Sequence, residues 1–229
     1  MLNPHTYRSR LCSGLWFSGL PVELQDALLH SASVRQLDAG QRLFHRGDPS
    51  GDLYAVLDGA IRIGAVNLAG KEALLTLVEP CAWFGEIALF DNQPRTHDAF
   101  AEGPTTLLQV PHQALQQLLA NQPLYWREFA LLLSQKLRLA FIALEDMSLL
   151  PAAPRLARRL LLMAEGYGAS REQRRVLQLP QEQLASMLAI SRQTTNQILK
   201  ELQTQGVVQL TYGGIEILDL EGLRQLAQV

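Results

Sequence analysis

Between Pro123 and Pro151 the chain contains neither glycine nor proline. This predicts one helix of about 25 residues within residues 122–149. Apolar side chains recur along it three or four positions apart, as in a heptad seam, at Trp126, Phe129, Leu133, Leu137, Ala140, Leu144 and Met147. Further apolar residues lie outside the seam, at Leu131, Leu132, Phe141 and Ile142. A helix packed only on its own domain is one interpretation. Because several apolar faces need cover, we also expect a homodimer formed through this helix.

The segment from Val34 to about Pro111 consists of short apolar or alternating runs separated by glycines. Strands at roughly ten-residue intervals with turn residues between them are typical of an antiparallel sandwich or roll. The expected strands are residues 43–44, 53–57, 61–63, 74–78 and 105–110.

The sequence Pro151-Ala152-Ala153-Pro154 ends the long helix, because proline cannot continue the helical hydrogen-bond ladder. We therefore expect two domains, residues 1–150 and 151–229. The second should contain a helix over 155–165, a helix-turn-helix over 181–206, a two-stranded wing over 207–210 and 215–218, and a last helix over 221–227. The predicted class is α+β: an antiparallel β-roll domain, a long central helix and a C-terminal winged helix-turn-helix domain.

The charge balance excludes a protein that binds nucleic acid through a large overall positive charge. The chain has 20 Lys and Arg against 22 Asp and Glu, a net charge of −2. From Pro151 onward, nine basic residues face seven acidic ones, which leaves this part at +2 and the remainder at −4. Positive charge is thus shifted toward the segment that would meet phosphates.

Other classes of protein find little support. Cys12 and Cys81 cannot form a disulfide framework, no role follows for Cys81, and the five histidines are not at metal-ligand spacing. We find no nucleophile–base pair, so the chain is not expected to be an enzyme. No run approaches the ~18 to 20 apolar residues of a membrane span. A cytoplasmic location without membrane contact is therefore expected.

Residues 84–96, called here the cassette, carry the first candidate site. A turn led by Gly85 can expose backbone N–H groups to an anion. Arg95, expected to return from the next strand, can place its planar fork of donors on a phosphate. The acceptor-only carboxylate of Glu86 suits a ribose hydroxyl. The alternative is a loop held together by a Glu86–Arg95 ion pair.

The second candidate site is the helix-turn-helix. Leu184, Ala185 and Leu188 would line the inner face of its first helix, and Ser191 is a suitable N-cap for the second. The second helix would turn Thr195, Ile198, Leu199 and Leu202 inward. Arg matches guanine in the major groove, and Gln or Asn matches adenine. A polar helix face can be merely solvated, but with the wing it predicts contact with double-stranded DNA. The DNA-binding candidates are Ser191, Arg192, Gln193, Thr194, Asn196, Gln197 and Lys200.

With these motifs in this order, about residues 15 to 220 resemble the CRP/FNR family of bacterial transcription regulators. The signatures are residues 84–86 with 94–95, and residues 190–194 leading to 198–202. The resemblance implies a cyclic nucleotide inside the roll that biases how the central helices hold the DNA-binding domains. Glu86 would then bind the ribose 2′-hydroxyl and Arg95 the cyclic phosphate. Gly85, Ile87 and Thr96 would complete the phosphate cradle, and Arg192, Gln193 and Gln197 would read bases.

Departures from the family pattern bear on which effector and which DNA half-site we expect. Ala140 and Phe141 stand where cyclic-AMP-dependent members carry hydroxyl side chains, which speaks against cyclic AMP, and Phe141 is expected to fill or stack against that space. Gln193 and Gln197 replace a Glu and an Arg, so we expect a different half-site that keeps a guanine read by Arg192. Two cysteines cannot ligate an iron–sulfur cluster.

Two further expectations concern partners and control. The loop Gly166–Arg171 resembles the region that touches RNA polymerase in activators of the family. An effector-independent dimeric regulator, whose roll is only a scaffold, remains the alternative to effector control.

Overall fold

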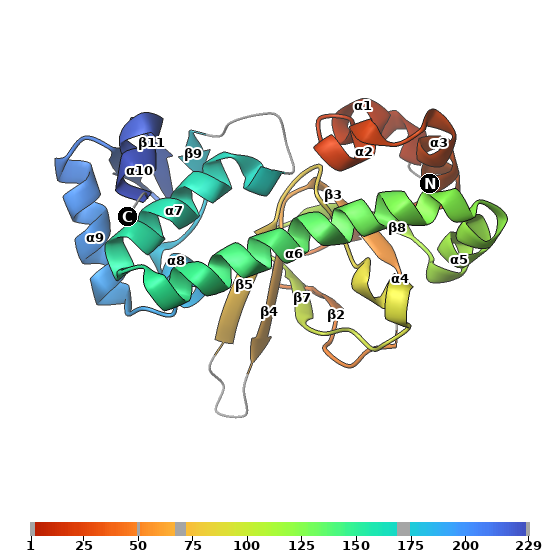
Figure 1. Cartoon of the computed structure of the whole chain (residues 1–229), viewed down its shortest axis with the longest axis horizontal. Helices are drawn as coiled ribbons and strands as arrows, with labels where there is room; N and C mark the ends of the chain where they lie inside the picture. The colour runs from red at the N-terminus through yellow and green to blue at the C-terminus, as the bar shows by residue number, and fades with distance from the viewer. Residues whose placement is uncertain (1–2, 50, 67–71, 169–174, 228–229) are drawn as a thin grey trace. The chain divides into compact units, whose positions relative to one another are not determined.

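The computed structural model describes residues 3–49, 51–66, 72–168 and 175–227 (Figure 1). The chain forms two compact units. The first comprises Met1–Lys71 with Leu75–Leu137, and the second Glu72–Leu74 with Arg138–Val229. The division falls inside the long helix α6 (Trp126–Leu149), so a functional boundary at Pro151 stays a prediction. In the described ranges no helix is both long enough and apolar enough to span a membrane.

Two four-stranded antiparallel sheets form the roll of the first unit. One has the order β1-β8-β3-β6 and the other β2-β7-β4-β5. The strands are β1 (Ser33–Leu37), β2 (Arg42–Phe44), β3 (Leu53–Asp58), β4 (Ile61–Val66), β5 (Glu72–Val78), β6 (Trp83–Phe84), β7 (Asp98–Ala101) and β8 (Thr105–Val110). The five expected strands are confirmed as β2, β3, β4, β5 and β8. Strands β1, β6 and β7 were not predicted from the sequence.

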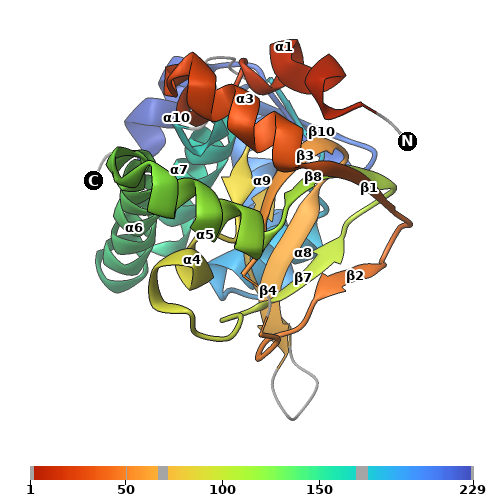
Figure 2. The same ribbon diagram turned by 90° about the vertical axis from the view of Figure 1, so that its right-hand side faces the viewer.

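Strand β3 explains the layering of this unit, because its side chains are buried on both faces. Alternate residues of a strand point to opposite faces. Tyr54 and Val56 accordingly join the core between the two sheets, whereas Leu53, Ala55 and Leu57 join the core beneath the helices. β8 pairs along β3 with Tyr54 opposite Gln109, and Figure 2 shows β1, β8 and β3 side by side. The continuous apolar run of β3 therefore marks the middle layer.

Helices cover the outer face of this middle sheet. They are η1 (Pro4–Tyr7), α1 (Arg8–Leu11), α2 (Leu15–Gly19), α3 (Val22–Ser31), α4 (Ile87–Asp91), α5 (His112–Asn121) and η2 (Pro123–Tyr125). Trp83 of β6 stacks on Phe17, with ring centroids 5.5 Å apart, and meets the edge of Trp16 at 5.3 Å. The indole N–H of Trp16 also donates to the carbonyl oxygen of Glu128 at 2.7 Å. The N-terminal helices and the start of α6 thus share one core.

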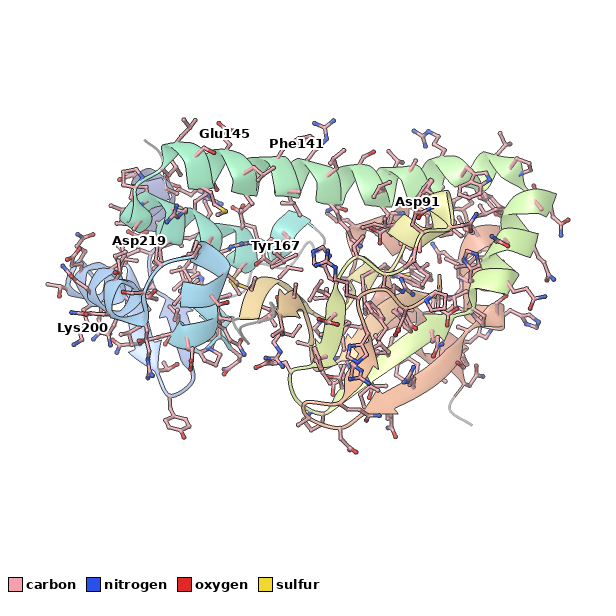
Figure 3. All side chains as sticks on the ribbon, turned by 90° about the horizontal axis from the view of Figure 1, so that it is seen from below. Asp91, Phe141, Glu145, Tyr167, Lys200 and Asp219 are labelled. Carbon is pink, nitrogen blue, oxygen red and sulfur yellow. The ribbon has the colours of Figure 1, made fainter. Side chains whose placement is uncertain are left out.

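The apolar seam of α6 is covered over only part of its length. Phe129 and Leu132 are fully or almost fully buried in the first unit. Farther along, Leu137, Phe141 and Leu144 are 52 %, 61 % and 60 % exposed. Figure 3 labels Phe141 on this exposed stretch of α6, so its expected role in filling or stacking against the purine space stays a prediction.

The second unit is a winged helix-turn-helix. After α7 (Ala152–Ala164) and η3 (Gly166–Gly168), it contains β9 (Val176–Leu177), α8 (Gln181–Leu188), α9 (Arg192–Thr204), β10 (Val208–Thr211), β11 (Gly214–Ile217) and α10 (Leu220–Ala227). The expected two-stranded wing is a three-stranded sheet in the order β10-β11-β9, because the short β9 adds to its edge. In Figure 1, α10 lies against α7, where Arg224 pairs with Glu165 at 2.9 Å.

A buried carboxylate lies where α6 meets α7. Asp146 is 6 % exposed, and its Oδ1 lies 3.3 Å from Nη1 of Arg158 without forming a hydrogen bond. Burial raises the pKa of Asp146, and the nearby Glu145 adds to this effect. The cations Arg158, Arg159 and Arg155 oppose it. The charged form of Asp146 is therefore disfavoured in the folded chain.

Replacing Asp146 by Asn tests whether the cost of burying the Asp146 carboxylate outweighs its attraction to the nearby arginines. A raised pKa in the folded state means that stability from Asp146 is largest below the ordinary aspartate pKa and is lost as pH rises through the raised value. We expect Asp146→Asn to match or exceed the wild type in unfolding free energy at neutral pH, with the advantage shrinking in acid. Denaturant titrations across pH measure this. A loss above about 1 kcal/mol at neutral pH would show that attraction to Arg158 outweighs burial.

Candidate functional site

Arg95 is the centre of the first candidate site. It is 6 % exposed and lies in the loop between α4 and β7, not on the next strand as expected, because the strand begins only at Asp98. Its Nη1 donates to the carbonyl oxygen of Gly85 at 3.0 Å, and its Nη2 to that of Asp52 at 2.6 Å. The guanidinium carbon lies 4.4 Å from the ring centre of Phe44. A cation is thus held inside the roll by carbonyl dipoles and an aromatic face.

The backbone around Arg95 leaves room only for glycine at position 85. Gly85 has φ +100°, a conformation that side chains rarely adopt. A Cβ there would lie 2.6 Å from the carbonyl oxygen of Asp52 and 3.0 Å from Nη1 of Arg95. The Asp52 carboxylate accepts hydrogen bonds from the Gln109 amide and the His112 N–H, at 2.6 and 2.8 Å. The carboxylate of Asp52 is thus engaged by Gln109 and His112, and its carbonyl oxygen is the atom that accepts a hydrogen bond from Arg95.

Glu86 pairs with a residue that sequence analysis missed. Its carboxylate is 1 % exposed and accepts a hydrogen bond from Nζ of Lys136 on α6 at 2.5 Å. The ion pair of the cassette is therefore Glu86–Lys136, not the Glu86–Arg95 pair that the alternative interpretation required. Lys136 lies one helical turn before Ala140. As the single lysine among the apolar residues of this helix, it could have been recognised from the sequence as the partner of a buried carboxylate. The pair joins the cassette to the long helix.

The two remaining cassette candidates have exposed side chains. Ile87 is 44 % exposed at the start of α4. Thr96 is also exposed, and its hydroxyl lies 2.9 Å from Nδ1 of His97. The structure therefore brings together Gly85, Glu86 and Arg95, with Ile87 and Thr96 adjacent to them along the chain.

The electrostatics of Arg95 favour an added anion. Burial lowers the pKa of Arg95, and the nearby Tyr54, Asp52 and Glu86 oppose the shift. Its Nε is buried without a hydrogen-bond partner. Buried polar atoms are otherwise almost always paired in proteins, so a lone Nε marks unused donor capacity. An anion within reach of this nitrogen would supply its missing hydrogen bond.

The helix-turn-helix shows the expected capping and inner face. Ser191 accepts a hydrogen bond from the N–H of Thr194 at 3.0 Å and so caps α9. Ala189, in the left-handed conformation at φ +53°, ends α8 and allows a tight turn. All four predicted inner residues of α9 are buried: Thr195, Ile198, Leu199 and Leu202. The Thr194 hydroxyl lies 2.8 Å from that of Ser191, so these two candidates build the cap.

The outer face of α9 forms a polar groove. It is lined by Arg192, Gln193, Asn196, Gln197, Lys200, Glu201, Thr204 and Gln205. This brings five of the seven predicted DNA-binding residues onto one surface, and Figure 3 shows Lys200 at the edge of its unit. Two exposed residues of the same unit were not predicted from the sequence. Glu201 accepts a hydrogen bond from Nε2 of Gln197 at 3.2 Å, and Tyr212 is fully exposed at the wing turn. A helix with such a polar outer face suits the major groove of DNA.

The Glu86–Lys136 pair yields a stability prediction. Lys136→Met leaves a buried carboxylate without its cation, so we expect a loss of about 3 kcal/mol in unfolding free energy. Adding Glu86→Gln should restore much of that loss, because the amide carries no charge. Arg138→Met, an exposed cation on the same helix, is the matched control. Unfolding by guanidinium chloride is measured for Lys136→Met, Glu86→Gln, the double variant and Arg138→Met, which gives the interaction free energy between Glu86 and Lys136. Additive losses from Lys136→Met and Glu86→Gln would contradict it.

Comparisons with known proteins match both units. Residues 34–122 match the model for a cyclic nucleotide-binding domain, and residues 154–226 the model for a Crp-like helix-turn-helix domain. The chain is 32 % identical to a cyclic AMP receptor protein of Thermus thermophilus over 92 % of this chain and 95 % of that one. It is 28 % identical to a CRP-like cAMP-activated global transcriptional regulator of Mycobacterium tuberculosis, over 93 % and 96 %.

Among solved structures, TTHA1359 of Thermus thermophilus, a transcriptional regulator of the CRP/FNR family, superposes with a TM-score of 0.68. The match is 29 % identical and covers 86 % of this chain and 99 % of that one. The order of roll, long helix and winged helix-turn-helix agrees with these matches. The chain belongs to the CRP/FNR family of transcription regulators.

Proposed function

We propose that this regulator binds an anionic effector of the cyclic-nucleotide class in its roll. The observation that carries the proposal is the buried Arg95, whose Nε has no partner and whose pKa is lowered by burial. An anion at the guanidinium would supply both the missing acceptor and the compensating charge. Gly85 keeps the backbone close to this point, and Glu86 offers an acceptor for a sugar hydroxyl.

The base of the effector is a separate question from its phosphate. Two relatives are named for cyclic AMP. In this chain Ala140 and Phe141 carry no hydroxyl, so they offer no side-chain hydrogen bond to a purine. We therefore propose that the phosphate and ribose contacts are kept and that the base is recognised differently from that of cyclic AMP.

One observation favours the alternative, a regulator that needs no effector. Both terminal nitrogens of Arg95 already donate to the backbone, and Glu86 is already paired with Lys136. An effector must compete with these internal contacts or add to them. In this second candidate function the cassette stabilises the roll, and the domain serves as a dimerisation scaffold.

For DNA binding we propose a homodimer that places two copies of α9 on a pseudo-palindromic site. The exposed side chains of Leu137, Phe141 and Leu144 recur at helical spacing on α6 and offer a self-complementary surface. Two recognition helices then read half-sites about one helical turn apart, roughly 34 Å. Arg192, Gln193 and Gln197 are proposed to contact bases and Lys200 a phosphate.

Two further proposals rest on family membership. RNA polymerase is a proposed partner, although residues 169–171 of the predicted contact loop lie outside the described residues. A cytoplasmic location is also proposed, since both DNA and polymerase are found there.

Effector binding is tested by thermal unfolding with cyclic AMP, cyclic GMP and cyclic di-GMP. A ligand at about one hundred times its Kd should raise the Tm by roughly 5 °C, because it binds only the folded chain. Arg95→Lys should reduce the shift, whereas Arg127→Ala, an exposed arginine on α6, should not. No shift with any of the three nucleotides would favour the effector-independent regulator.

The DNA surface is tested by anisotropy titrations with duplexes that vary at each base. Arg192→Ala should cost about 1–3 kcal/mol and relax the preference at one position. Lys200→Ala should weaken binding to all sequences equally and reduce the salt dependence by about one phosphate contact. If Arg192→Ala weakens all duplexes equally, Arg192 contacts only phosphate.

A further inference from the structure

We infer that Glu201 is a positioning residue that orients the amide of Gln197 and thereby sets the base that Gln197 reads. The inference rests on the proposed DNA-binding function of α9. Glu201 lies one helical turn after Gln197, and Nε2 of Gln197 donates to Oε1 of Glu201 at 3.2 Å. Both side chains line the same groove and are exposed, so a bound duplex meets them together.

The chemistry of the pair determines which way the amide faces. A glutamine amide has one acceptor oxygen and two N–H donors, and a free amide can present either end. The Glu201 carboxylate only accepts hydrogen bonds, so it holds the nitrogen of the Gln197 amide toward itself. The oxygen Oε1 and one remaining N–H of Gln197 are then directed away from Glu201.

An acceptor beside a single donor matches adenine. In the major groove adenine offers the N6 amino donor next to the N7 acceptor, whereas guanine offers two acceptors, O6 and N7. A Gln197 amide held by Glu201 can bond to both adenine groups at once. A freed amide can rotate and give its N–H groups to guanine. The Glu201–Gln197 pair therefore selects adenine over guanine at one position of the half-site.

The charge of Glu201 gives its removal a distinctive signature. A carboxylate on a DNA-facing helix is repelled by phosphates, so its loss should leave overall DNA affinity unchanged or higher. Its role as a positioning residue predicts that discrimination between bases falls at the same time. A residue that only stabilised α9 would lower the affinity for every duplex and leave the base preference intact.

The test uses the full-length protein and a library of duplexes selected for binding. The wild type and Gln197→Ala are compared first, because the position at which preference is lost identifies the base that Gln197 reads. We expect Glu201→Ala to reduce the adenine-to-guanine ratio at that position by about fivefold or more, part of the range of a bidentate contact. Glu201→Asp should keep much of the ratio, since an aspartate four residues after a glutamine can also accept its hydrogen bond.

Several outcomes distinguish a failure of the role of Glu201 from a failure of DNA recognition by α9. The double variant Gln197→Ala/Glu201→Ala should lose no more discrimination than Gln197→Ala alone. An unchanged ratio in Glu201→Ala, or a loss at a different position, would overturn the role of Glu201 while leaving DNA recognition by α9 intact. A wild type that binds every duplex equally, with Arg192→Ala behaving identically, would instead overturn the proposed function.

Discussion

The roll depends on the burial of one cation. The guanidinium of Arg95 lies among Phe44, Tyr54 and the carbonyl oxygens of Gly85 and Asp52, and these contacts join three segments of the unit. Burying a charge is costly unless its surroundings supply compensating polarity. The carbonyl oxygens supply part of this compensation and bring the loop after β6 against the loop before β3. The same arrangement leaves one buried donor, Nε, without a hydrogen-bond partner.

A second ion pair connects this site with the helix that bears the exposed apolar face. Glu86 follows directly on Gly85, and Lys136 lies on α6 one residue before Leu137. A change at the cassette that disturbs Glu86 therefore acts on Lys136 and the helix that carries it. This contact gives a physical route from the proposed effector to the proposed dimer surface. The charge distribution also differs between the two ends of the chain, because residues 151–229 carry a net positive charge and the remainder a net negative one.

Much of the fold could be predicted, and the misses have identifiable reasons. The α3 helix carries Leu24 and Leu28 at helical spacing and could have been recognised from the sequence. By contrast, β1 (Ser33–Leu37) buries only its last residue, and β6 is only two residues long, so neither presents an alternating pattern. The position of Arg95 in a loop depends on where β7 begins, and strand boundaries are poorly encoded locally.

The sequence by itself determined the features that depend on near neighbours. These are the long helix between Pro123 and Pro151, the cap at Ser191, the glycine at position 85 and the polar outer face of α9. Turn chemistry and helical periodicity act over a few residues, so they can be recognised without a fold. Only the tertiary structure decided that Glu86 pairs with Lys136, fifty positions away, and that the seam of α6 is buried over one part and exposed over another. Such contacts depend on which surfaces the folded chain brings together.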